Sequence, residues 1–452
     1  MELKNKKVLV AGSGKSGIAA ADLLKKIGAE VTIYDGNQNL DREEILSGLE
    51  NREEVEVILG ELPKTVISHM DLMILSPGIA IDAPFVNEVR AAGVPIWGEV
   101  ELAYVTGKGK VVAITGTNGK TTTTALTGEI LASYYEKVDV VGNIGIPYTH
   151  TALNSTEDTV TVAEISSFQL ETIHTFHPNV SAVLNITPDH LNRHYTMECY
   201  TNVKMSITKN QCGDEPVILN YEDEILRAYA PKLHNKIIWF SSKQALEEGI
   251  YLEGKNIVYA TKTGKQVITT TEDTTLVGIH NIENIMAAIG ISLMMGVPAD
   301  IIKRSITKFK AVAHRIEYVD TIDEVIYYND SKGTNTDASI KAIEAMSRPT
   351  VLIAGGYDKK VSFDQWAASF DGKIKCLVLL GETAGQIAES VQKYGFENIV
   401  FTKSLEEAVD VCKEKAEPGD AVLLSPACAS WDMFDSYEQR GDMFKELVKK
   451  NK

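Results

Sequence analysis

The stretch VVAITGTNGKTTTT (residues 111–124) decides which fold this chain is expected to adopt. It opens on apolar, β-branched residues that predict a buried strand, turns through Gly116 and Gly119, and continues into residues that suit a helix start. Such a turn points several backbone N–H groups at one spot, where the helix dipole adds positive potential. Lys120 would reach the outer phosphates of a nucleotide, and Thr121 would bind the accompanying Mg²⁺. The stretch therefore predicts a phosphate-binding loop, with ATP as the nucleotide.

The loop departs from the strict pattern G-x-x-x-x-G-K-[ST] at its first position, where Ile114 stands. The remaining G-T-N-G-K-T still lies between a strand pattern and a helix pattern. A glycine turn without a ligand is the alternative, and the strand-to-helix context favours nucleotide binding over it.

Bulk properties limit the class of protein. The 452 residues suffice for about three domains of ~100–200 residues each. A formal net charge of −17 argues against a nucleic-acid partner. No apolar run is long enough to span a bilayer, and no leader pattern precedes the first strand, so we expect a soluble, cytoplasmic protein with no membrane partner. The cysteines show no C-x-x-C spacing, which favours reduced thiols: Cys199, Cys212, Cys376, Cys412 and Cys428.

The first hundred residues predict a doubly wound α/β domain. A strand at 7–12 is followed by G-S-G-K-S-G, a helix pattern and a second strand that ends at Asp35. An acid about 20 residues after the glycines matches the dinucleotide fingerprint, although such sheets bind many nucleotides and sugars besides NAD. A further strand ends in Ser76-Pro77-Gly78, at the sheet edge where ligands of this fold bind.

Further candidates follow the phosphate loop. Asn143 lies in a turn after a strand, and Glu164 ends the next strand, where an acid among small and apolar residues suits an Mg²⁺ ligand better than a surface position. A lone histidine usually packs or faces solvent, but His190 follows another strand of this domain, which favours a ligand role. From the helix pattern alone Lys204 would belong to a solvated face, and Asn281 and Asn284 would cap a helix at 280–298.

Strand-then-turn units from residue 311 onward predict a second doubly wound sheet. We therefore expect an α/β fold of three domains: a Rossmann-like N-terminal domain (1–100), a central P-loop ATPase-like domain (101–311) and a C-terminal Rossmann-like domain (312–452). A site assembled between such domains can exclude water from a reactive phosphorylated intermediate.

The ordered motifs of this chain resemble those of the Mur ligases, ATP-dependent peptide ligases of bacterial cell-wall synthesis. The motifs are AITGTNGKT (113–121), EISSFQLE (164–171), NITPDHLNRH (185–194), HNIEN (280–284), HR (314–315), NDSKGTN (329–335) and LLSPACAS (423–430). They cover essentially the whole chain in the family's order. The segments Asn329–Lys332 and Ser425–Asp432 resemble the branch that adds D-glutamate to UDP-N-acetylmuramoyl-L-alanine, so these two substrates are the expected small-molecule partners.

The resemblance implies a mechanism. The γ-phosphate of ATP would pass to the alanyl carboxylate, and the amine of D-glutamate would attack the resulting acyl phosphate. Lys120, Glu164, His190 and Lys204 are the expected catalytic residues. Two Mg²⁺ ions would be held by Thr121, Glu164, His190 and a Lys204 carbamylated by CO₂, which turns that cation into a metal-binding carboxylate.

The resemblance also implies a set of binding residues. ATP would contact Gly116, Thr117, Asn118, Gly119, Lys120, Thr121, Thr122, Asn284, Arg315 and Asp330. The UDP moiety would contact Lys15, Ser16, Asp35, Ser76 and Gly78. Asn143 would lie near the reacting carboxylate, and D-glutamate would contact Lys332, Thr334, Lys359 and Ser430.

Some positions depart from the family pattern. Ala311 and Ala313 replace a common glycine and proline in the hinge, Asn192 replaces a frequent aspartate, and Lys360 competes with Lys359 for the D-glutamate role. Two other functions are weighed against the D-glutamate ligase: a folylpolyglutamate-synthase-like ligase and a non-catalytic nucleotide-binding protein. We expect a monomer.

Overall fold

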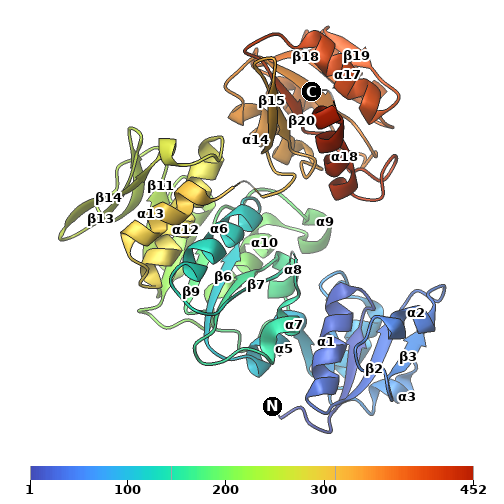
Figure 1. Cartoon of the computed structure of the whole chain (residues 1–452). Helices are drawn as coiled ribbons and strands as arrows, with labels where there is room; N and C mark the ends of the chain where they lie inside the picture. The colour runs from blue at the N-terminus through green and yellow to red at the C-terminus, as the bar shows by residue number, and fades with distance from the viewer. Residues whose placement is uncertain (1, 144, 311, 451–452) are drawn as a thin grey trace. The chain divides into compact units, whose positions relative to one another are not determined.

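The computed structural model describes residues 2–143, 145–310 and 312–450, so Ala311, at the predicted domain boundary and hinge, lies outside the described residues. Three separate sheets are present (Figure 1). The chain divides into two compact units. One runs from the N-terminus to Asp273 and includes Glu283–Thr307, and the other comprises Thr274–Ile282 and the chain from Lys308 onward.

The first sheet has five parallel strands in the order β3-β2-β1-β4-β5. Its turn after β1 requires glycine, because a Cβ on Gly17 would lie 1.9 Å from the Gly12 carbonyl oxygen. The elements are β1 (Lys7–Ala11), α1 (Lys15–Lys26), β2 (Glu30–Asp35), α2 (Arg42–Ser47), β3 (Glu56–Leu59), α3 (Lys64–Ile67), β4 (Leu72–Leu75), α4 (Pro84–Ala91) and β5 (Ile96–Gly98).

The second sheet has nine strands in the order β14-β13-β12-β11-β10-β9-β6-β8-β7. Strands β6 to β12 run parallel, and the hairpin strands β13 and β14 extend the edge in antiparallel pairing. The phosphate loop therefore follows an interior strand, β6, which lies between β9 and β8. The strands are β6 (Lys110–Thr115), β7 (Val138–Gly142), β8 (Val160–Glu164), β9 (Val180–Val183), β10 (Pro216–Asn220), β11 (Lys236–Ser241), β12 (Gly249–Glu253), β13 (Asn256–Thr261) and β14 (Gly264–Thr270).

Helices connect these strands. They are α5 (Glu99–Thr106), α6 (Lys120–Ala132), α7 (Tyr148–Ala152), α8 (Ser167–Leu170), α9 (Leu191–His194), α10 (Met197–Met205), α11 (Glu224–Tyr229), α12 (Ile279–Met294) and α13 (Ala299–Lys308), with 3₁₀ turns at Ser206–Thr208, Ala230–Lys232 and Thr271–Asp273. Among the described residues no helix has both the length and the apolar character that a bilayer span requires.

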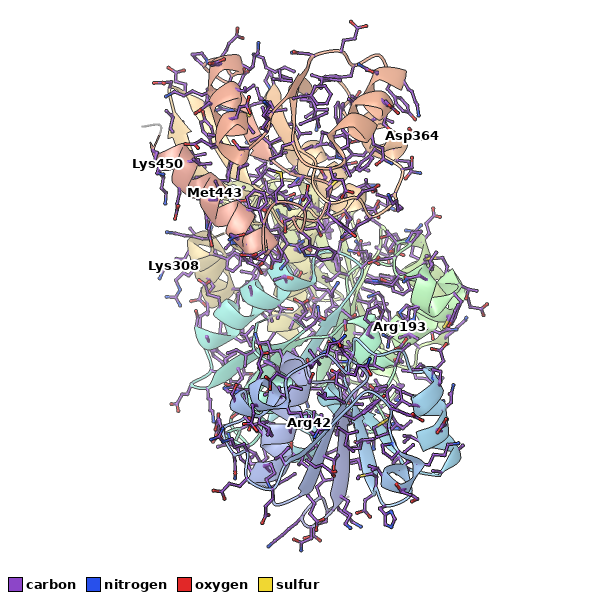
Figure 2. All side chains as sticks on the ribbon, turned by 90° about the vertical axis from the view of Figure 1, so that its right-hand side faces the viewer. Arg42, Arg193, Lys308, Asp364, Met443 and Lys450 are labelled. Atoms are coloured by element: carbon purple, nitrogen blue, oxygen red, sulfur yellow. The ribbon has the colours of Figure 1, made fainter. Side chains whose placement is uncertain are left out.

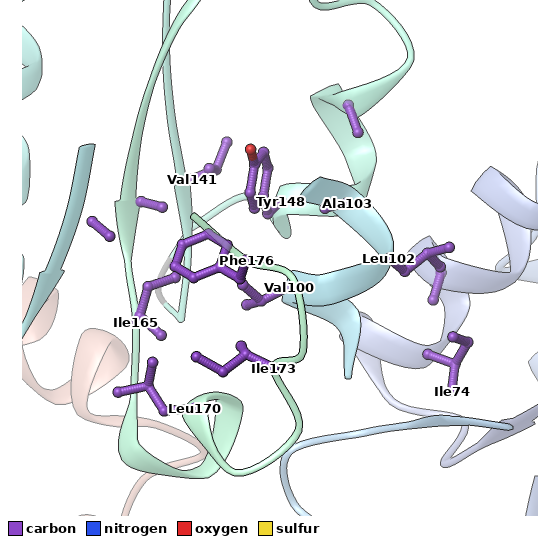
Figure 3. Packing of buried hydrophobic residues seen from close by; sticks show 14 of the residues in the cluster. Ile74, Val100, Leu102, Ala103, Val141, Tyr148, Ile165, Leu170, Ile173 and Phe176 are labelled. Atoms are coloured by element: carbon purple, nitrogen blue, oxygen red, sulfur yellow. The ribbon is translucent and has the colours of Figure 1, made fainter. Parts of the chain in front are cut away.

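Helix α5 joins the cores of the first two sheets. Val100 and Leu102 are fully buried in the same hydrophobic cluster as Ile74 of β4 and Phe176 of the segment before β9 (Figure 3). At about 25 cal/mol per Å² of apolar surface, such shared burial favours one compact unit over two separate domains. The two sheets therefore belong to a single compact unit.

The third sheet has six strands in the order β15-β16-β20-β17-β18-β19, with β15 antiparallel and the others parallel. The elements are β15 (Glu317–Ile322), β16 (Val325–Asn329), α14 (Thr336–Ala345), β17 (Thr350–Ala354), α15 (Asp364–Ala368), β18 (Ile374–Leu379), α16 (Ala384–Lys393), β19 (Ile399–Phe401), α17 (Leu405–Lys415), β20 (Ala421–Leu424) and α18 (Tyr437–Lys450). The predicted α/β fold with three sheets is confirmed. The exact domain limits stay a prediction.

The capping interpretation of the two asparagines is wrong. Helix α12 begins at Ile279, so Asn281 and Asn284 lie inside its first turns. The Asn281 side chain instead donates a hydrogen bond of 2.7 Å to the carbonyl oxygen of Val277. Neither asparagine therefore stands at the position that caps α12.

Candidate active site

The phosphate loop has the backbone that its sequence predicts. Gly116 leaves β6 at φ +150°, and Gly119 precedes α6 in the left-handed region at φ +87°. A Cβ at Gly119 would lie 2.2 Å from Oδ1 of Asn284, so only glycine fits between the loop and α12. This contact puts the amide of Asn284 against the phosphate loop.

The Lys120 side chain folds back over its own loop. Its Nζ donates hydrogen bonds to the carbonyl oxygens of Gly116 (2.9 Å) and Thr117 (2.8 Å). The ammonium is therefore held over the turn whose N–H groups form the anion-binding end of α6. A phosphate bound there would meet this cation directly.

Asn185, which sequence reasoning did not select, holds the loop in shape. Its Oδ1 accepts from the Asn118 N–H at 2.8 Å, and its Nδ2 donates to the Asn118 carbonyl oxygen at 3.0 Å. The Thr117 hydroxyl accepts from the N–H of Thr187 at 3.0 Å. The only sequence signal for Asn185 is its place directly after a buried strand, inside the NITPDH motif.

Glu164 ends β8 beside the phosphate loop. The register pairs it with Ile114 of β6 and with Gly142 of β7, which puts all three segments at the carboxyl edge of the sheet. Its side chain is buried, and its Oε1 accepts a 3.0 Å hydrogen bond from Nδ2 of Asn143. A buried carboxylate at such an edge suits a cation ligand.

His190 lies in the left-handed region at φ +52° in the loop after β9. Its Nε2 is 3.4 Å from Oδ2 of Asp189, and its ring packs on Phe168 with the centroids 4.7 Å apart. Burial lowers the pKa of His190, Asp189 opposes this, and the nearby charges of Lys204 and Lys120 lower it further. A neutral imidazole is the form that binds a metal.

Lys204 is not on a solvated face, so that interpretation of its helix pattern is wrong. The residue is 2 % exposed, its Nζ donates to the Gly116 carbonyl oxygen at 2.8 Å, and it lies 4.9 Å from the Tyr200 ring centroid. Burial holds its pKa well below the usual value and Lys120 lowers it further, against the opposing charges of Asp189 and Glu164. Helix α10 thus turns this lysine inward, toward the phosphate loop.

Four candidates from separate segments therefore share one region. Lys120, Glu164, His190 and Lys204 follow or flank β6, β8 and β9, which are neighbours in the sheet. The donor set fits Mg²⁺, because carboxylate and hydroxyl oxygens are the ligands that hard cations prefer. Thr121, in the first turn of α6, would supply the hydroxyl.

The predicted UDP residues lie at the carboxyl edge of the first sheet. Asp35 Oδ2 accepts from both the N–H (3.0 Å) and the hydroxyl (2.7 Å) of Ser13, so this acid braces the glycine turn. The hydroxyl of Ser76 is buried and has no hydrogen-bond partner within the described parts of the chain. A buried polar atom of this kind costs free energy unless a ligand or water satisfies it.

Arg193, labelled in Figure 2, lies in α9. Its side chain ties the Ser76–Ile79 turn to the central sheet. Its guanidinium donates to the carbonyl oxygens of Pro77 (2.9 Å) and Ile79 (2.8 Å), and it forms an ion pair with Glu171 at 2.5 Å. The guanidinium also lies 4.2 Å from the Phe168 ring centroid. Sequence reasoning missed this residue, whose only signal is its place three residues after His190.

The predicted C-terminal residues form their own group in the second unit. Asp330 is buried, its Oδ2 accepts from the Ser425 hydroxyl at 2.7 Å, and its Oδ1 accepts from the Ile316 N–H at 3.2 Å. Burial raises the pKa of Asp330 to about 7, although Ser425 and Arg315 act in the opposite direction. Nε of Arg315 is buried without a hydrogen-bond partner among the described residues.

The predicted D-glutamate residues are partly brought together. Nζ of Lys359 donates to the Thr334 carbonyl oxygen at 3.1 Å and lies 5.6 Å from the Trp431 ring centroid, next to Ser430. Lys360 instead pairs with Asp358 at 2.8 Å, and Lys332 lies over the Tyr437 ring. These contacts favour Lys359 over Lys360.

Arg440 is a second residue that sequence reasoning missed. It is 2 % exposed, and its guanidinium donates to the Ser331 carbonyl oxygen at 2.8 Å and to the Ser331 hydroxyl at 2.9 Å. It therefore fixes the turn between Asp330 and Lys332. The sequence could have indicated Arg440, because it is a charged residue on the apolar face of the helix pattern at 437–450.

Three family models match the chain in order: the Mur ligase MurD-like N-terminal domain over residues 6–98, the Mur ligase middle domain over 114–292, and the Mur ligase glutamate ligase domain over 314–428. Curated relatives match over 99 % of both chains. Those from Lachnospira eligens and Lachnoclostridium phytofermentans are 54 % and 53 % identical, and that from Clostridioides difficile is 45 % identical. The chain belongs to the Mur ligase family.

The relatives carry the name UDP-N-acetylmuramoylalanine–D-glutamate ligase. Solved structures support the fold of this Mur ligase. The UDP-N-acetylmuramate–alanine ligase MurC of Thermotoga maritima has a TM-score of 0.61 at 18 % identity, covering 99 % of this chain and 100 % of that chain. The MurF ligase of the same organism, solved with ADP, has a TM-score of 0.61 at 16 % identity, covering 100 % and 97 %. The resemblance stated from the motifs is thereby confirmed.

Proposed function

We propose that this Mur ligase joins D-glutamate to UDP-N-acetylmuramoyl-L-alanine, using ATP and passing through an acyl phosphate. The observation that carries the proposal is the match to D-glutamate ligases over 99 % of both chains. The grouping of Lys120, Glu164, His190 and Lys204 beside the phosphate loop supports it. The enzyme would act in the cytoplasm as a monomer, without nucleic-acid or membrane partners.

Bringing two anions together is the first problem of this reaction. The γ-phosphate and the alanyl carboxylate repel each other, so positive charge must surround the transferring group. Lys120 and the N–H groups of residues 116–119 supply such charge from the phosphate loop. Asn143, fixed by its hydrogen bond to Glu164, would orient the attacking carboxylate.

Mg²⁺ would be held by Thr121, Glu164, His190 and Lys204 at two positions, and when bound it would neutralise phosphate charge and polarise the transferring group. Burial of Glu164, and the loop conformation that fixes His190, would keep these ligands in place. Lys204 can serve as a ligand only after its charge is removed.

Carbamylation of Lys204 fits its surroundings. The ammonium would first lose a proton, and the neutral amine nitrogen would then attack the carbon of CO₂. An N–C bond would form as a C=O π bond of CO₂ opens, and the nitrogen would release a second proton, which leaves a carboxylate in place of the ammonium. A buried ammonium beside Lys120 is costly, whereas a carboxylate there would be attracted by Lys120 and by a bound cation.

The proposed binding residues for ATP, UDP and D-glutamate come from three parts of the chain. Asn284 lies against the loop and would meet adenine, and Arg315 and Asp330 would also contact ATP. The Ser76 hydroxyl, Gly78, Lys15, Ser16 and Asp35 would line the UDP site. Lys332, Thr334, Lys359 and Ser430 would bind D-glutamate, with the lysines pairing with its carboxylates.

Product identification tests the proposal. The enzyme is given ATP, Mg²⁺ and UDP-N-acetylmuramoyl-L-alanine with an equimolar mixture of D-glutamate, L-glutamate and L-lysine, and the product is analysed by mass spectrometry and by its chirality. We expect addition of D-glutamate alone. Addition of L-glutamate to a folate acceptor under matched conditions would instead identify a folylpolyglutamate-synthase-like ligase.

A further inference from the structure

Three metal-binding side chains meet at the edge of the central sheet opposite the active site. They are His177, Cys212 and Glu215, whose ligand atoms all lie within 4.8 Å of one another. Nε2 of His177 lies 2.6 Å from Oε2 of Glu215. The phosphate loop follows the carboxyl end of β6, whereas these three residues lie in the segments that enter β9 and β10. The cluster is thus separate from the proposed Mg²⁺ ligands.

The fold itself brings the three side chains together. Strands β9 and β10 are parallel neighbours, so the segments that enter them lie side by side. His177 stands three residues before β9, and Glu215 stands directly before β10. Residues 38 positions apart in the sequence therefore meet without any long side-chain reach.

The turn that carries two of the ligands is held rigidly. The Cys212 N–H donates to Oε2 of Glu215 at 2.5 Å, and the Glu215 N–H donates to the Cys212 carbonyl oxygen at 3.1 Å. Nδ2 of Asn235, from the segment before β11, contacts the Glu215 carbonyl oxygen at 3.4 Å. A metal needs ligands whose positions are fixed beforehand, and this turn provides them.

The donor set selects the metal. Sulfur, imidazole nitrogen and carboxylate oxygen together suit Zn²⁺, whereas Mg²⁺ binds thiolate sulfur poorly. Three protein ligands leave one tetrahedral position for water. The Cys212 thiol is exposed and the other two residues are partly exposed, so an ion can enter from solvent.

We propose that His177, Cys212 and Glu215 form a Zn²⁺ site that clamps the entrances of β9 and β10. The site is independent of the proposed ligase chemistry. Bound zinc would cross-link the segment at 171–179 to the turn at 212–215 and so stabilise the part of the sheet that leads into the His190 loop. Zinc would therefore raise the thermal midpoint of the full chain.

Cobalt substitution tests the site directly. The reduced, metal-free full-length protein is titrated with Co²⁺ in the absence of nucleotide, and the sulfur-to-cobalt charge-transfer band is recorded. Zinc affinity is then measured by competition with a chromophoric chelator. Cys199→Ser is the matched control, because Cys199 is the other exposed cysteine among the described residues. Glu215→Gln tests the carboxylate.

We expect the wild type and Cys199→Ser to bind one zinc and to show the band, which Cys212→Ser loses. Loss of even an outer partner of a metal site costs about 10–100-fold in affinity, so Cys212→Ser and Glu215→Gln should each lose at least about tenfold. Zinc should raise the thermal midpoint only where Cys212 is intact. Absence of stoichiometric zinc in the wild type, or an unchanged band in Cys212→Ser, would overturn the proposal. Ligase activity is measured separately and does not decide it.

Discussion

Lys204 is the residue whose surroundings demand the most explanation. An ammonium 2 % exposed, beside the Lys120 cation, has lost its hydration and gained a repulsive neighbour. Its Nζ donates a hydrogen bond to a neutral carbonyl oxygen at 2.8 Å. Conversion to a carbamate would replace that repulsion with attraction, which is why we propose that the carbamate would be a metal ligand.

Replacing Lys204 with alanine should abolish turnover while the chain still folds, because the variant removes the proposed carbamate ligand. Added acetate or propionate should restore part of the activity by supplying a free carboxylate. Initial rates of ATP turnover measure both effects, and circular dichroism checks the fold. Lys209→Ala, on the turn that follows the same helix, is the control and should keep its activity without added acid. A folded Lys204→Ala variant that no short carboxylate rescues would count against the carbamate.

Asp330 gives a prediction about pH. Its pKa is about 7 in the folded chain and 3.8 in the reference state, so the folded form holds a proton that the unfolded form has released. Below pH 3.8 Asp330 is protonated in both the folded and the unfolded state, so its full contribution to the free energy of unfolding is present. As pH rises through the interval to 7, the free energy of unfolding falls, by about 4 kcal/mol at most. Asp330→Asn removes this dependence.

Thermal midpoints of the wild type and Asp330→Asn between pH 5 and pH 8 measure the difference. The wild type should lose stability relative to the variant as pH rises, since other groups titrate alike in both chains. A difference that stays constant across this interval would show that Asp330 does not carry the raised pKa.

The sequence predicted those site residues whose role follows from their local position in a strand, turn or helix. It did not predict residues whose burial or contacts depend on distant parts of the chain. Lys120 and Glu164 stand at a glycine turn and a strand end, where position alone indicates chemistry. Lys204 could not be identified from its helix pattern, because its burial depends on contacts with Gly116, 88 residues away. Arg440 acts on Ser331 across 109 residues for the same reason.

At the scale of elements, the Arg193–Glu171 pair connects two binding regions. The guanidinium holds the Pro77–Ile79 turn, which belongs to the predicted UDP site, while His190 lies three residues before it in the same loop and helix. Both partners are largely buried, so breaking the pair would leave an uncompensated charge. We therefore expect binding of the nucleotide sugar at the predicted UDP site to be coupled to the loop that carries His190.

Arg193→Lys should raise the KM for the nucleotide sugar more than it lowers kcat, because one ammonium cannot hold both carbonyl oxygens and Glu171. We expect an increase of about tenfold or more, from the loss of one to two buried charged hydrogen bonds. Steady-state kinetics with saturating ATP and D-glutamate measure it. Arg304→Lys, in an exposed pair with Asp300, is the control and should leave KM unchanged. If both variants have the KM of the wild type, the contacts of Arg193 with the Pro77–Ile79 turn and Glu171 have no role in binding the nucleotide sugar.

The sequence predicted the limits of those strands that are short apolar runs followed by glycine. It did not predict where α12 begins. Asn favours the capping position in general, but here Asn281 bonds back to Val277 and the helix begins two residues earlier, at Ile279. The preference of asparagine for the capping position therefore did not determine where α12 begins. The segment before the helix allows it to start at Ile279.

At the scale of the whole molecule, three sheets and three matching family domains agree with the α/β fold expected from the strand-then-turn units. Helix α5 and its neighbours join the first two sheets in one hydrophobic core. The sequence did not predict this shared core. Burial in that core joins Val100 and Leu102 to residues of both sheets, and no spacing rule specifies such a contact. The predicted limits at residues 100 and 311 therefore stay predictions.

The most direct test of the central claim is phosphate release from ATP with UDP-N-acetylmuramoyl-L-alanine, measured with D-glutamate, with L-glutamate, with L-lysine and with no amino acid. We predict release that depends on the nucleotide sugar and on D-glutamate together. Equal release in all four reactions, or release only with L-glutamate or L-lysine, would contradict the proposed function.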